Sequence, residues 1–322
     1  MFLVSACVPL YRPRAQWLDA LLRSLAEQEC ESLEVVLRDD SPPSRAREET
    51  AAVVAKWSSA FARLSYAAND ATLGMVGNWN ATVRASNGAL AINVHQDDAL
   101  LPGMFGAMAT EFAGSRSVVV CGVGARYIDE AGAPLPWLPR MDRARIYQQR
   151  SRYELSLRDM VSLNLRNGQA FGEPSAVMFR RSAFDAVGGY DEQFEHAADV
   201  DFNIRLASVG RAVYLPTPYL LRRMHGRSLT ATHIDNGATG RDRVRLFRRY
   251  AMTSGLSRAE VARIRTTVTT RFLRDAARAF FRRRRALGWA SVRAMSPFWR
   301  NRPTYYASHL FELATGKSLD ER

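Results

Sequence analysis

The sequence of 322 residues has few cysteines and no long apolar run. Cys7, Cys30 and Cys121 stand far apart, and their spacing matches neither a metal site nor the disulfide framework of a small secreted domain. A reducing compartment is therefore favoured over a secreted location. No stretch is long enough to span a bilayer, and Met1 leads into a short apolar run without the basic segment of a leader peptide. Together these absences predict a cytoplasmic protein.

A glycine-rich turn is also missing after the first apolar run, where residues 9–13 read Pro-Leu-Tyr-Arg-Pro. This absence argues against a dinucleotide-dependent dehydrogenase, whose phosphate-binding turn needs glycine. The chain does contain 47% hydrophobic and 24% charged residues, which is typical of a globular protein with a sizeable core. Its net charge is +13, and arginine is concentrated in the C-terminal third, most densely at 282–285. Such a region attracts polyanions: nucleic acid, anionic lipid headgroups or phosphorylated substrates.

Apolar runs that predict strands alternate with segments of helical spacing through the N-terminal third. The predicted strands there are 2–8, 33–37, 64–67 and 89–94, and the predicted helices are 16–27, 45–57 and 78–85. Further strands are predicted at 117–122, 175–180 and 212–215, and further helices at 182–187 and 199–209. This alternation predicts an α/β fold with a mainly parallel sheet flanked by helices. From about residue 240 the pattern is helical and rich in arginine.

Several candidate site residues follow the predicted strands at the point where each strand ends. Residues 9–11 follow the first strand, Asp39 and Asp40 the second, and Asp97 and Asp98 the fourth. Ligands of such sheets gather outside the carboxyl ends of the strands, so we expect these residues to converge on one crevice. Two adjacent carboxylates repel each other unless a cation lies between them, and a divalent cation such as Mg²⁺ is the usual partner. The alternative for Asp97 and Asp98 is a solvated acidic turn.

The order of several short motifs carries more information than any one of them. They are Val8-Pro9-Leu10-Tyr11, the segments 35–41 and 73–80, His95-Gln96-Asp97-Asp98, Gly172-Glu173-Pro174-Ser175, the segments 188–192 and 198–201, and His225 ahead of 228–230. In this order and spacing the chain resembles the family 2 inverting glycosyltransferases of the GT-A (Rossmann-like) fold, over roughly residues 2–230. It is similar to the bacterial branch that builds surface polysaccharides.

The resemblance implies a nucleotide-sugar donor of the UDP or dTDP type. Pro9 and Tyr11 would border the base, and Asp39 or Asp40, with Asp40 favoured, would accept a hydrogen bond from a ring N–H of the base. Asn78, expected at the start of a helix, would help to hold the nucleotide. The alternatives are that Tyr11 only packs and that Asn78 only caps its helix.

The resemblance also implies a metal site. Asp97 and Asp98 match the family's Asp-x-Asp element, in which one carboxylate reaches the ribose and one the Mn²⁺ or Mg²⁺ that bridges the diphosphate. The family's commonest form has Asp where this chain has His95, so the expected ligands are Asp97, Asp98 and His225. The alternative for His225 is a surface histidine in an arginine-rich turn.

A catalytic base is implied at the start of the helix predicted at 199–209. Asp199 would deprotonate the acceptor hydroxyl, and Asp201 is the rival candidate, although residues two apart do not share a helix face. The family often has Glu-Asp where this chain has Ala198 and Asp199, so one carboxylate is missing. Glu173 would help to seat the acceptor, unless it is merely a loop acid.

These implications predict a metal-dependent inverting transferase that moves a hexosyl or deoxyhexosyl group to a glycan or lipid-linked glycan acceptor. Residues 1–235 would form the catalytic domain, and 236–322 a helical basic extension. That extension would lie on an anionic membrane at the inner face of the cytoplasmic membrane, or else pack as a helical cap or at a homodimer interface. The alternatives are a relative that binds a sugar nucleotide without transferring it, and a nucleic-acid-binding protein. The last is disfavoured because the basic region lacks a nucleic-acid-reading signature.

Overall fold

The computed structural model describes residues 3–30, 32–135, 146–226, 238–252 and 255–281. The chain divides into two compact units. Unit 1 comprises Met1–Met160, Gln169–Gln193 and Ala198–His225, and unit 2 comprises Val161–Gly168, Phe194–Ala197 and Gly226–Arg322. The predicted domain boundary at 235/236 and the arginine run at 282–285 both lie outside the described residues.

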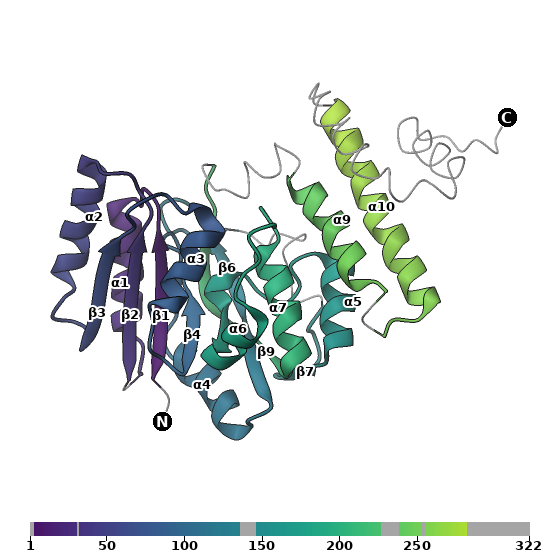
Figure 1. Cartoon of the computed structure of the whole chain (residues 1–322), viewed down its shortest axis with the longest axis horizontal. Helices are drawn as coiled ribbons and strands as arrows, with labels where there is room; N and C mark the ends of the chain where they lie inside the picture. The colour runs from purple at the N-terminus through teal and green to yellow at the C-terminus, as the bar shows by residue number, and fades with distance from the viewer. Residues whose placement is uncertain (1–2, 31, 136–145, 227–237, 253–254, 282–322) are drawn as a thin grey trace. The chain divides into compact units, whose positions relative to one another are not determined.

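Unit 1 is built on a mixed sheet, which has nine strands in the part of the chain described (Figure 1). Its order is β3-β2-β1-β4-β8-β6-β9-β5, with β7 also paired to β9. The strands are β1 Val4–Leu10, β2 Leu33–Asp39, β3 Arg63–Ala68, β4 Leu90–Asn93, β5 Ala99–Leu100, β6 Val118–Ile128, β7 Tyr153–Leu155, β8 Val177–Arg180 and β9 Arg211–Arg223.

Helices of unit 1 flank this sheet. They are α1 Ala15–Ala26, α2 Arg45–Lys56, α3 Gly74–Arg84, α4 Met104–Gly114, α6 Arg181–Val187 and α7 Ala198–Val209, with a short 3₁₀ turn at Pro174–Ala176. A further helix, α5 Leu157–Asn167, runs from unit 1 into unit 2. Apolar side chains of α1, α2 and α4 join the strands in one buried core. A second apolar layer forms where Phe184 of α6 and Phe202 of α7 pack on Phe179 of β8.

The predicted α/β class is confirmed, and the pairing shows where the parallel part ends. β2 pairs in parallel with β1 and β3, β4 with β1, and β9 with β6. β8 is antiparallel to both β4 and β6, and β9 is antiparallel to β5 and β7. The carboxyl ends of β1, β2 and β4 therefore meet at one edge, as the alternating pattern predicts.

The start of α3 differs from the prediction. The helix begins at Gly74 and not at Asn78, because the carboxylate of Asp40 accepts hydrogen bonds from the backbone N–H groups of Leu73 (2.7 Å) and Gly74 (2.9 Å). An acid in this position satisfies N–H groups that have no partner within the helix and complements the helix dipole. Asn78 consequently lies in the middle of α3.

The end of β9 differs as well. The prediction stops the strand at Leu215 because proline lacks an N–H for the ladder. In the structure β9 continues to Arg223, and the register with β6 shifts by extra residues around Pro216 and Thr217. Such a bulge accommodates a proline without breaking the sheet. Gly124 of β6 allows the close approach, because a Cβ there would lie 2.3 Å from the carbonyl oxygen of Pro216.

Unit 2 contains two arginine-rich helices, α9 Ala238–Tyr250 and α10 Arg258–Phe281. Val244 and Leu246 of α9 and Ile264, Val268, Phe272 and Leu273 of α10 are buried, and the two helices pack closely where Phe272 meets Gly240. Arg241, Arg245 and Arg248 are exposed at i, i+4 and i+7 of α9, which places them on one face. The apolar side chains Val244 and Leu246 of α9 are buried, so the exposed face of this helix presents arginines and not an apolar stripe.

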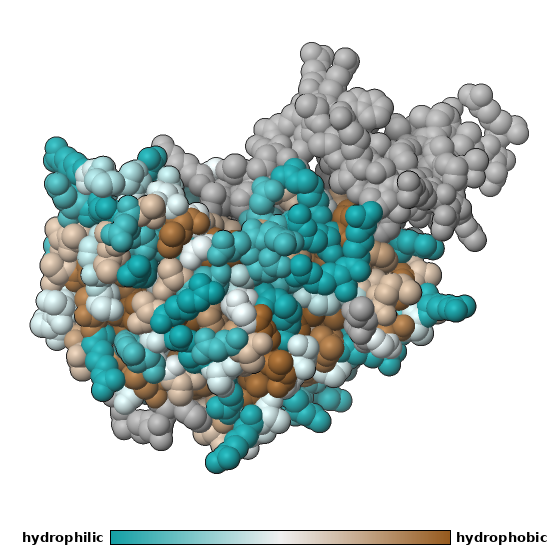
Figure 2. Space-filling model, in the orientation of Figure 1, coloured by the Kyte–Doolittle hydropathy of each residue, from teal (hydrophilic) through white to brown (hydrophobic). Residues whose placement is uncertain are grey.

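None of the helices in the described ranges is long and apolar enough to cross a membrane. On the face shown in Figure 2, apolar residues form small areas that hydrophilic residues separate. The large apolar side chains that are exposed in the described part of the chain are Tyr11, Leu73, Val209 and Met252. Tyr11 and Leu73 flank the loop that contains Asp40, so two of these side chains border the carboxyl edge of the sheet.

Candidate active site

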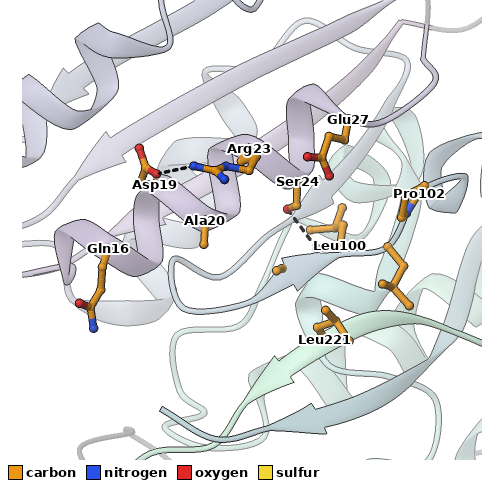
Figure 3. Close-up of a pocket in the computed structure, with 11 residues that line it drawn as sticks. Gln16, Asp19, Ala20, Arg23, Ser24, Glu27, Leu100, Pro102 and Leu221 are labelled. Carbon is orange, nitrogen blue, oxygen red and sulfur yellow. Dashed lines mark hydrogen bonds and ion pairs between the residues drawn. The ribbon is translucent and has the colours of Figure 1, made fainter. Parts of the chain in front are cut away.

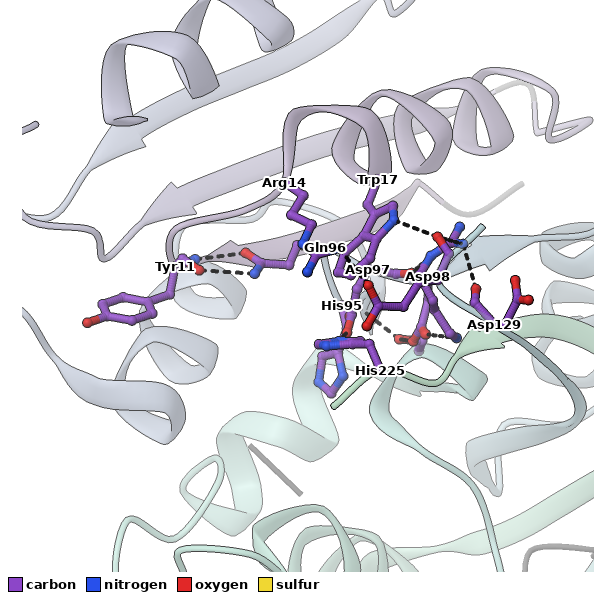
Figure 4. Close-up of polar contacts among 12 residues, drawn as sticks. Tyr11, Arg14, Trp17, His95, Gln96, Asp97, Asp98, Asp129 and His225 are labelled. Carbon is purple, nitrogen blue, oxygen red and sulfur yellow. Dashed lines mark hydrogen bonds and ion pairs between the residues drawn. The ribbon is translucent and has the colours of Figure 1, made fainter. Parts of the chain in front are cut away.

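The loops after β1, β2 and β4 are joined by hydrogen bonds. The backbone N–H of Tyr11 donates to Oε1 of Gln96 (2.8 Å), and Nε2 of Gln96 donates to the carbonyl of Tyr11 (3.0 Å) (Figure 4). The backbone N–H of Asp40 donates to the carbonyl of Leu10 (2.9 Å). These contacts confirm the predicted convergence of the three loops at one edge of the sheet.

The two acids after β2 are buried among neutral donors. Asp39 accepts hydrogen bonds from the backbone N–H of Ser41 (2.8 Å) and the hydroxyl of Tyr66 (2.9 Å). Asp40 accepts from Nδ2 of Asn69 (2.8 Å) in addition to its two contacts at the start of α3. Their contact with a nucleotide base stays a prediction, and the structure gives both carboxylates a part in holding the loop.

Three further predicted nucleotide contacts differ in accessibility. Pro9 lies within β1 and is buried, whereas Tyr11 is 47% exposed and available to a ligand. Asn78 is buried, and its Nδ2 donates to the carbonyls of Leu10 and Arg38 (both 3.2 Å). Asn78 therefore ties α3 to β1 and β2, and its role toward the nucleotide remains a prediction.

Asp97 and Asp98 lie in the turn between β4 and β5 together with His95. One potential ligand atom from each of these three residues lies within 4.8 Å of the others, a grouping that could hold a metal ion. Asp98 accepts hydrogen bonds from Oγ of Ser175 (2.6 Å) and the backbone N–H of Arg223 (3.1 Å). Burial raises the pKa of Asp98 to about 8, and the charge of Asp97 adds to that rise.

His225 reaches this cluster through Asp97. Its Nε2 lies 2.8 Å from Oδ2 of Asp97, and its ring packs on Trp17 at a centroid distance of 4.8 Å (Figure 4). Burial acts to raise the pKa of Asp97, but the hydrogen bond to His225 and the nearby His95 outweigh it and lower that pKa. The His225 side chain is 9% exposed, so His225 is a largely buried partner of the cluster and not a surface histidine.

Arg223 and Trp17 hold the turn that contains Asp97 and Asp98. Arg223 donates through Nε to the carbonyl of Asp97 (3.0 Å) and through Nη1 to the carbonyl of Asp129 (3.0 Å). Its guanidinium lies 5.4 Å from the Trp17 ring centroid, and Nε1 of Trp17 donates to the carbonyl of Glu130 (3.2 Å). The turn after β6, the end of β9 and α1 thus meet beside Asp97.

Asp199 is buried in the first turn of α7. Its Oδ1 accepts from the backbone N–H of Val200 (2.8 Å), and its Oδ2 accepts a short hydrogen bond from Nε2 of Gln169. Burial raises the pKa of Asp199 to about 6, against the lowering effect of these hydrogen bonds. The rival candidate Asp201 is fully buried and pairs with Arg205 at 2.7 Å. Asp199 has the better environment for a base.

An ion pair lies among the candidate acids. Nη1 of Arg222 donates to Oε1 of Glu173 at 2.6 Å, and both side chains are largely buried. The charge of Arg222 lowers the pKa of both Asp98 and Asp199, whereas the charge of Glu173 raises the pKa of Asp199. The two predicted centres, the metal cluster and the base, therefore share one electrostatic environment.

A separate hollow of about 430 Å³ lies between α1 and β5 (Figure 3). Its lining includes none of the predicted site residues. Arg23 pairs with Asp19 at 3.5 Å, and Oγ of Ser24 accepts from the backbone N–H of Leu100 (3.1 Å). The Ser24 contact joins α1 to β5, whereas the pair of Arg23 and Asp19 lies within α1 and is exposed to solvent.

The family model described as glycosyl transferase family 2 matches residues 5–188. The chain belongs to glycosyl transferase family 2. A relative, the uncharacterized protein MT1568 of Mycobacterium tuberculosis, is 31% identical over 224 residues, which cover 69% of this chain and 67% of that protein.

Solved structures show the same fold as this family 2 chain. S. aureus TarS 1-349 in complex with UDP-GlcNAc matches with a TM-score of 0.59 and 16% identity, over 97% of this chain and 81% of the TarS 1-349 chain. The mannosyltransferase PcManGT from Pyrobaculum calidifontis, in complex with GDP-Man and Mn²⁺, matches with a TM-score of 0.60 and 14% identity, over 100% of this chain and 88% of that one. The predicted GT-A fold is therefore confirmed.

The residues of this family 2 site fit a divalent cation. Carboxylates and imidazoles are suitable ligands for Mn²⁺, and carboxylates for Mg²⁺. Nε2 of His95 and Nδ1 of His225 are buried without a hydrogen-bond partner among the residues described, so nitrogen donors are available beside Asp97 and Asp98. The acidic turn is held by neighbouring groups and is not freely solvated, which argues against the alternative of a solvated acidic turn.

Sequence reasoning missed several residues of the site. It treated His95 only as a lost acid, yet His95 lies in the cluster with Asp97 and Asp98. It gave no role to Gln169 or to Arg222, which face Asp199 and Glu173. Gln169 carries no motif, and Arg222 lies beyond the proline at which the predicted strand ends. Arg222 could have been predicted in the site only by recognising that β9 continues past Pro216 and pairs with the end of β6.

Proposed function

We propose that this family 2 glycosyltransferase moves a hexosyl or deoxyhexosyl group from a UDP- or dTDP-linked donor to a glycan or lipid-linked glycan acceptor. The proposal includes dependence on Mn²⁺ or Mg²⁺ and inversion at the anomeric carbon. Nucleotide sugars are the ligands named for TarS and PcManGT, and Mn²⁺ is named for PcManGT, which supports the donor class and the metal.

One observation carries the proposal. The charge of Arg222 acts to lower the pKa values of His95 and Asp98 in the metal cluster and of the buried Asp199. A transferase needs a site for the diphosphate and a base for the acceptor close to each other. A protein that only binds a sugar nucleotide has no need of a carboxylate with a raised pKa beside that cluster.

Asp199 is the proposed base. Its carboxylate accepts the proton of the acceptor hydroxyl while the hydroxyl oxygen attacks the anomeric carbon from the side opposite the diphosphate. The bond from carbon to the diphosphate oxygen breaks, its electron pair leaves with the diphosphate, and the configuration inverts. Gln169 holds Oδ2 of Asp199, so one carboxylate oxygen is positioned by the protein.

The donor side is assigned to the edge residues. Tyr11, 47% exposed, borders the base together with Pro9, and Asp40 or Asp39 accepts a hydrogen bond from it. Asp97 and Asp98 hold the cation with a neighbouring histidine, His225 being the one predicted. When bound, the cation neutralises charge on the leaving diphosphate as a Lewis acid.

Donor binding tests this proposal. A panel of UDP-, dTDP- and GDP-sugars, each with Mn²⁺ and with EDTA, is screened for thermal stabilisation of the chain. We expect one class to raise the melting temperature only with metal, and the double variant Asp97→Ala with Asp98→Ala to lose that shift. Asp70→Ala, an exposed acid of the loop before α3, is the control and keeps the shift. Equal stabilisation of the double variant would refute the site.

Peripheral attachment to the inner face of the cytoplasmic membrane is the proposed location. The exposed arginines Arg241, Arg245 and Arg248 support it, because clustered arginines attract anionic lipid headgroups. Arg241 also pairs with Glu195 and Arg245 with Asp242, so lipid headgroups would compete with these two carboxylates. We expect the chain to co-sediment with phosphatidylserine vesicles and to release when salt is raised. Tighter binding to an oligonucleotide at the same salt would favour a nucleic-acid partner instead.

A further inference from the structure

His95 is the residue of the acidic turn for which neither the sequence nor the proposed function gives a role. It lies two residues before Asp97, and one of its ring nitrogens shares the cluster in which the ligand atoms are within 4.8 Å of one another. Asp98 is buried and Asp97 is a quarter exposed, so the cluster is open on the side of Asp97. His95, Asp97 and Asp98 are the residues that would hold a cation there.

The unpartnered nitrogen of His95 is an independent observation. Nε2 of His95 is buried and has no hydrogen-bond partner within the described ranges. A buried polar atom of this kind is usually satisfied by protein, water or an ion. Neutral imidazole nitrogen is a good ligand for first-row transition metals.

Neighbouring groups hold both the ring and the backbone of His95 in position beside Asp98. The ring packs on Trp79 with a centroid distance of 5.2 Å. The backbone N–H of His95 donates to Oγ of Ser175 (2.9 Å), and the same hydroxyl donates to Oδ2 of Asp98 (2.6 Å). Ser175 thus sets the position of His95 and of Asp98 together, which is the arrangement expected around a preorganised metal site.

His225 has a different relation to the cluster. Its Nε2 lies 2.8 Å from Oδ2 of Asp97, and its ring is packed on Trp17. A histidine that holds a carboxylate in this way orients the ligand from outside the metal. The two histidines therefore have separable roles that a spectroscopic test can distinguish.

We propose that His95 is the nitrogen ligand of the cation bound by Asp97 and Asp98, and that the site consequently prefers Mn²⁺, Co²⁺ or Zn²⁺ to Mg²⁺. The inference rests on the proposed function for the presence of a cation. His225 orients Asp97. A site with one imidazole is less suited to Mg²⁺, which takes oxygen ligands and keeps much of its water.

The test uses the untagged full chain, Mn²⁺ and excess inorganic pyrophosphate, which fills the phosphate positions without adding nitrogen. Electron spin-echo modulation reports ¹⁴N bound to Mn²⁺. We expect the nitrogen signal in the wild type and in His225→Gln, and its loss in His95→Gln. His95→Asp, which restores a carboxylate, is the second variant, and we expect it to bind Mn²⁺ without the nitrogen signal.

Metal competition gives a second readout. The ratio of Mg²⁺ to Mn²⁺ dissociation constants, measured by calorimetry, should fall about ten-fold or more in His95→Asp. Bound Mn²⁺ without a nitrogen signal, or a signal lost only in His225→Gln, overturns the role of His95 and leaves the proposed function intact. No bound Mn²⁺ in any form of the chain overturns the metal dependence in the proposed function as well.

Discussion

Two pairs of buried acids differ in what surrounds them. Asp39 and Asp40 accept hydrogen bonds from backbone N–H groups, a hydroxyl and an amide. Asp98 and Asp199 are also buried, but each lies among other charged groups, and burial raises the pKa values of both. Burial alone therefore does not mark a reactive carboxylate. The partners of Asp40 tie it to the start of α3, and the raised pKa of Asp199 is the reason for proposing Asp199 as the base.

Replacing the proposed base Asp199 should give the largest loss of activity and so test the contrast between the two pairs of acids. Asp199→Asn keeps the shape of the side chain but cannot accept the acceptor proton, so we expect transfer to fall about 10²–10⁴-fold. Donor affinity should stay close to that of the wild type, because Asp199 is not assigned to the nucleotide. Sugar transfer is measured by nucleotide release, and affinity by calorimetry. Asp201→Asn is the comparison, and a larger loss there would move the base to Asp201.

The pH profile gives the next effect. The pKa of Asp199 is raised to about 6, so the carboxylate is protonated and inactive below that pH. We expect transfer to fall about ten-fold per pH unit below 6. The same shift means that folding stability decreases as pH rises from the unfolded value near 3.8 through 6, since the folded state binds the proton more tightly. A rate that stays constant from pH 7 to 5 would contradict the assignment.

The smallest expected effect is on stability and concerns Asp40, one of the two acids that lie among neutral donors. Asp40→Ala removes the acceptor for Leu73, Gly74 and Asn69, so we expect the free energy of unfolding without ligand to fall by about 1–3 kcal/mol. Asp40→Asn keeps one acceptor and should lose less. Urea unfolding followed by tryptophan fluorescence measures both. The exposed Asp70→Ala is the control, with an expected change within about 0.5 kcal/mol, and a loss as small for Asp40→Ala would break the comparison.

The sequence predicted the elements and the convergence better than it predicted the individual contacts. Local signals were sufficient to predict the end of α6, where Gly188 has the positive φ of 79° that glycine permits. They were also sufficient to predict the strands β2 and β4, after which Asp40 and Asp98 follow. The start of α3 was placed one turn late, because its cap is Asp40, more than thirty residues earlier in the chain. Contacts such as that of Gln169 with Asp199 depend on the folded chain and leave no periodic signal.

The bulge in β9 decides which way two neighbouring arginines point. Side chains alternate along a strand, and Arg222 turns to Glu173 while Arg223 turns to the carbonyl of Asp97. The extra residues around Pro216 therefore determine which face of the sheet each later side chain of β9 points to. Shortening this segment by one residue would exchange the two guanidinium groups and separate both from their partners, so a segment remote from the acids governs the charge around them.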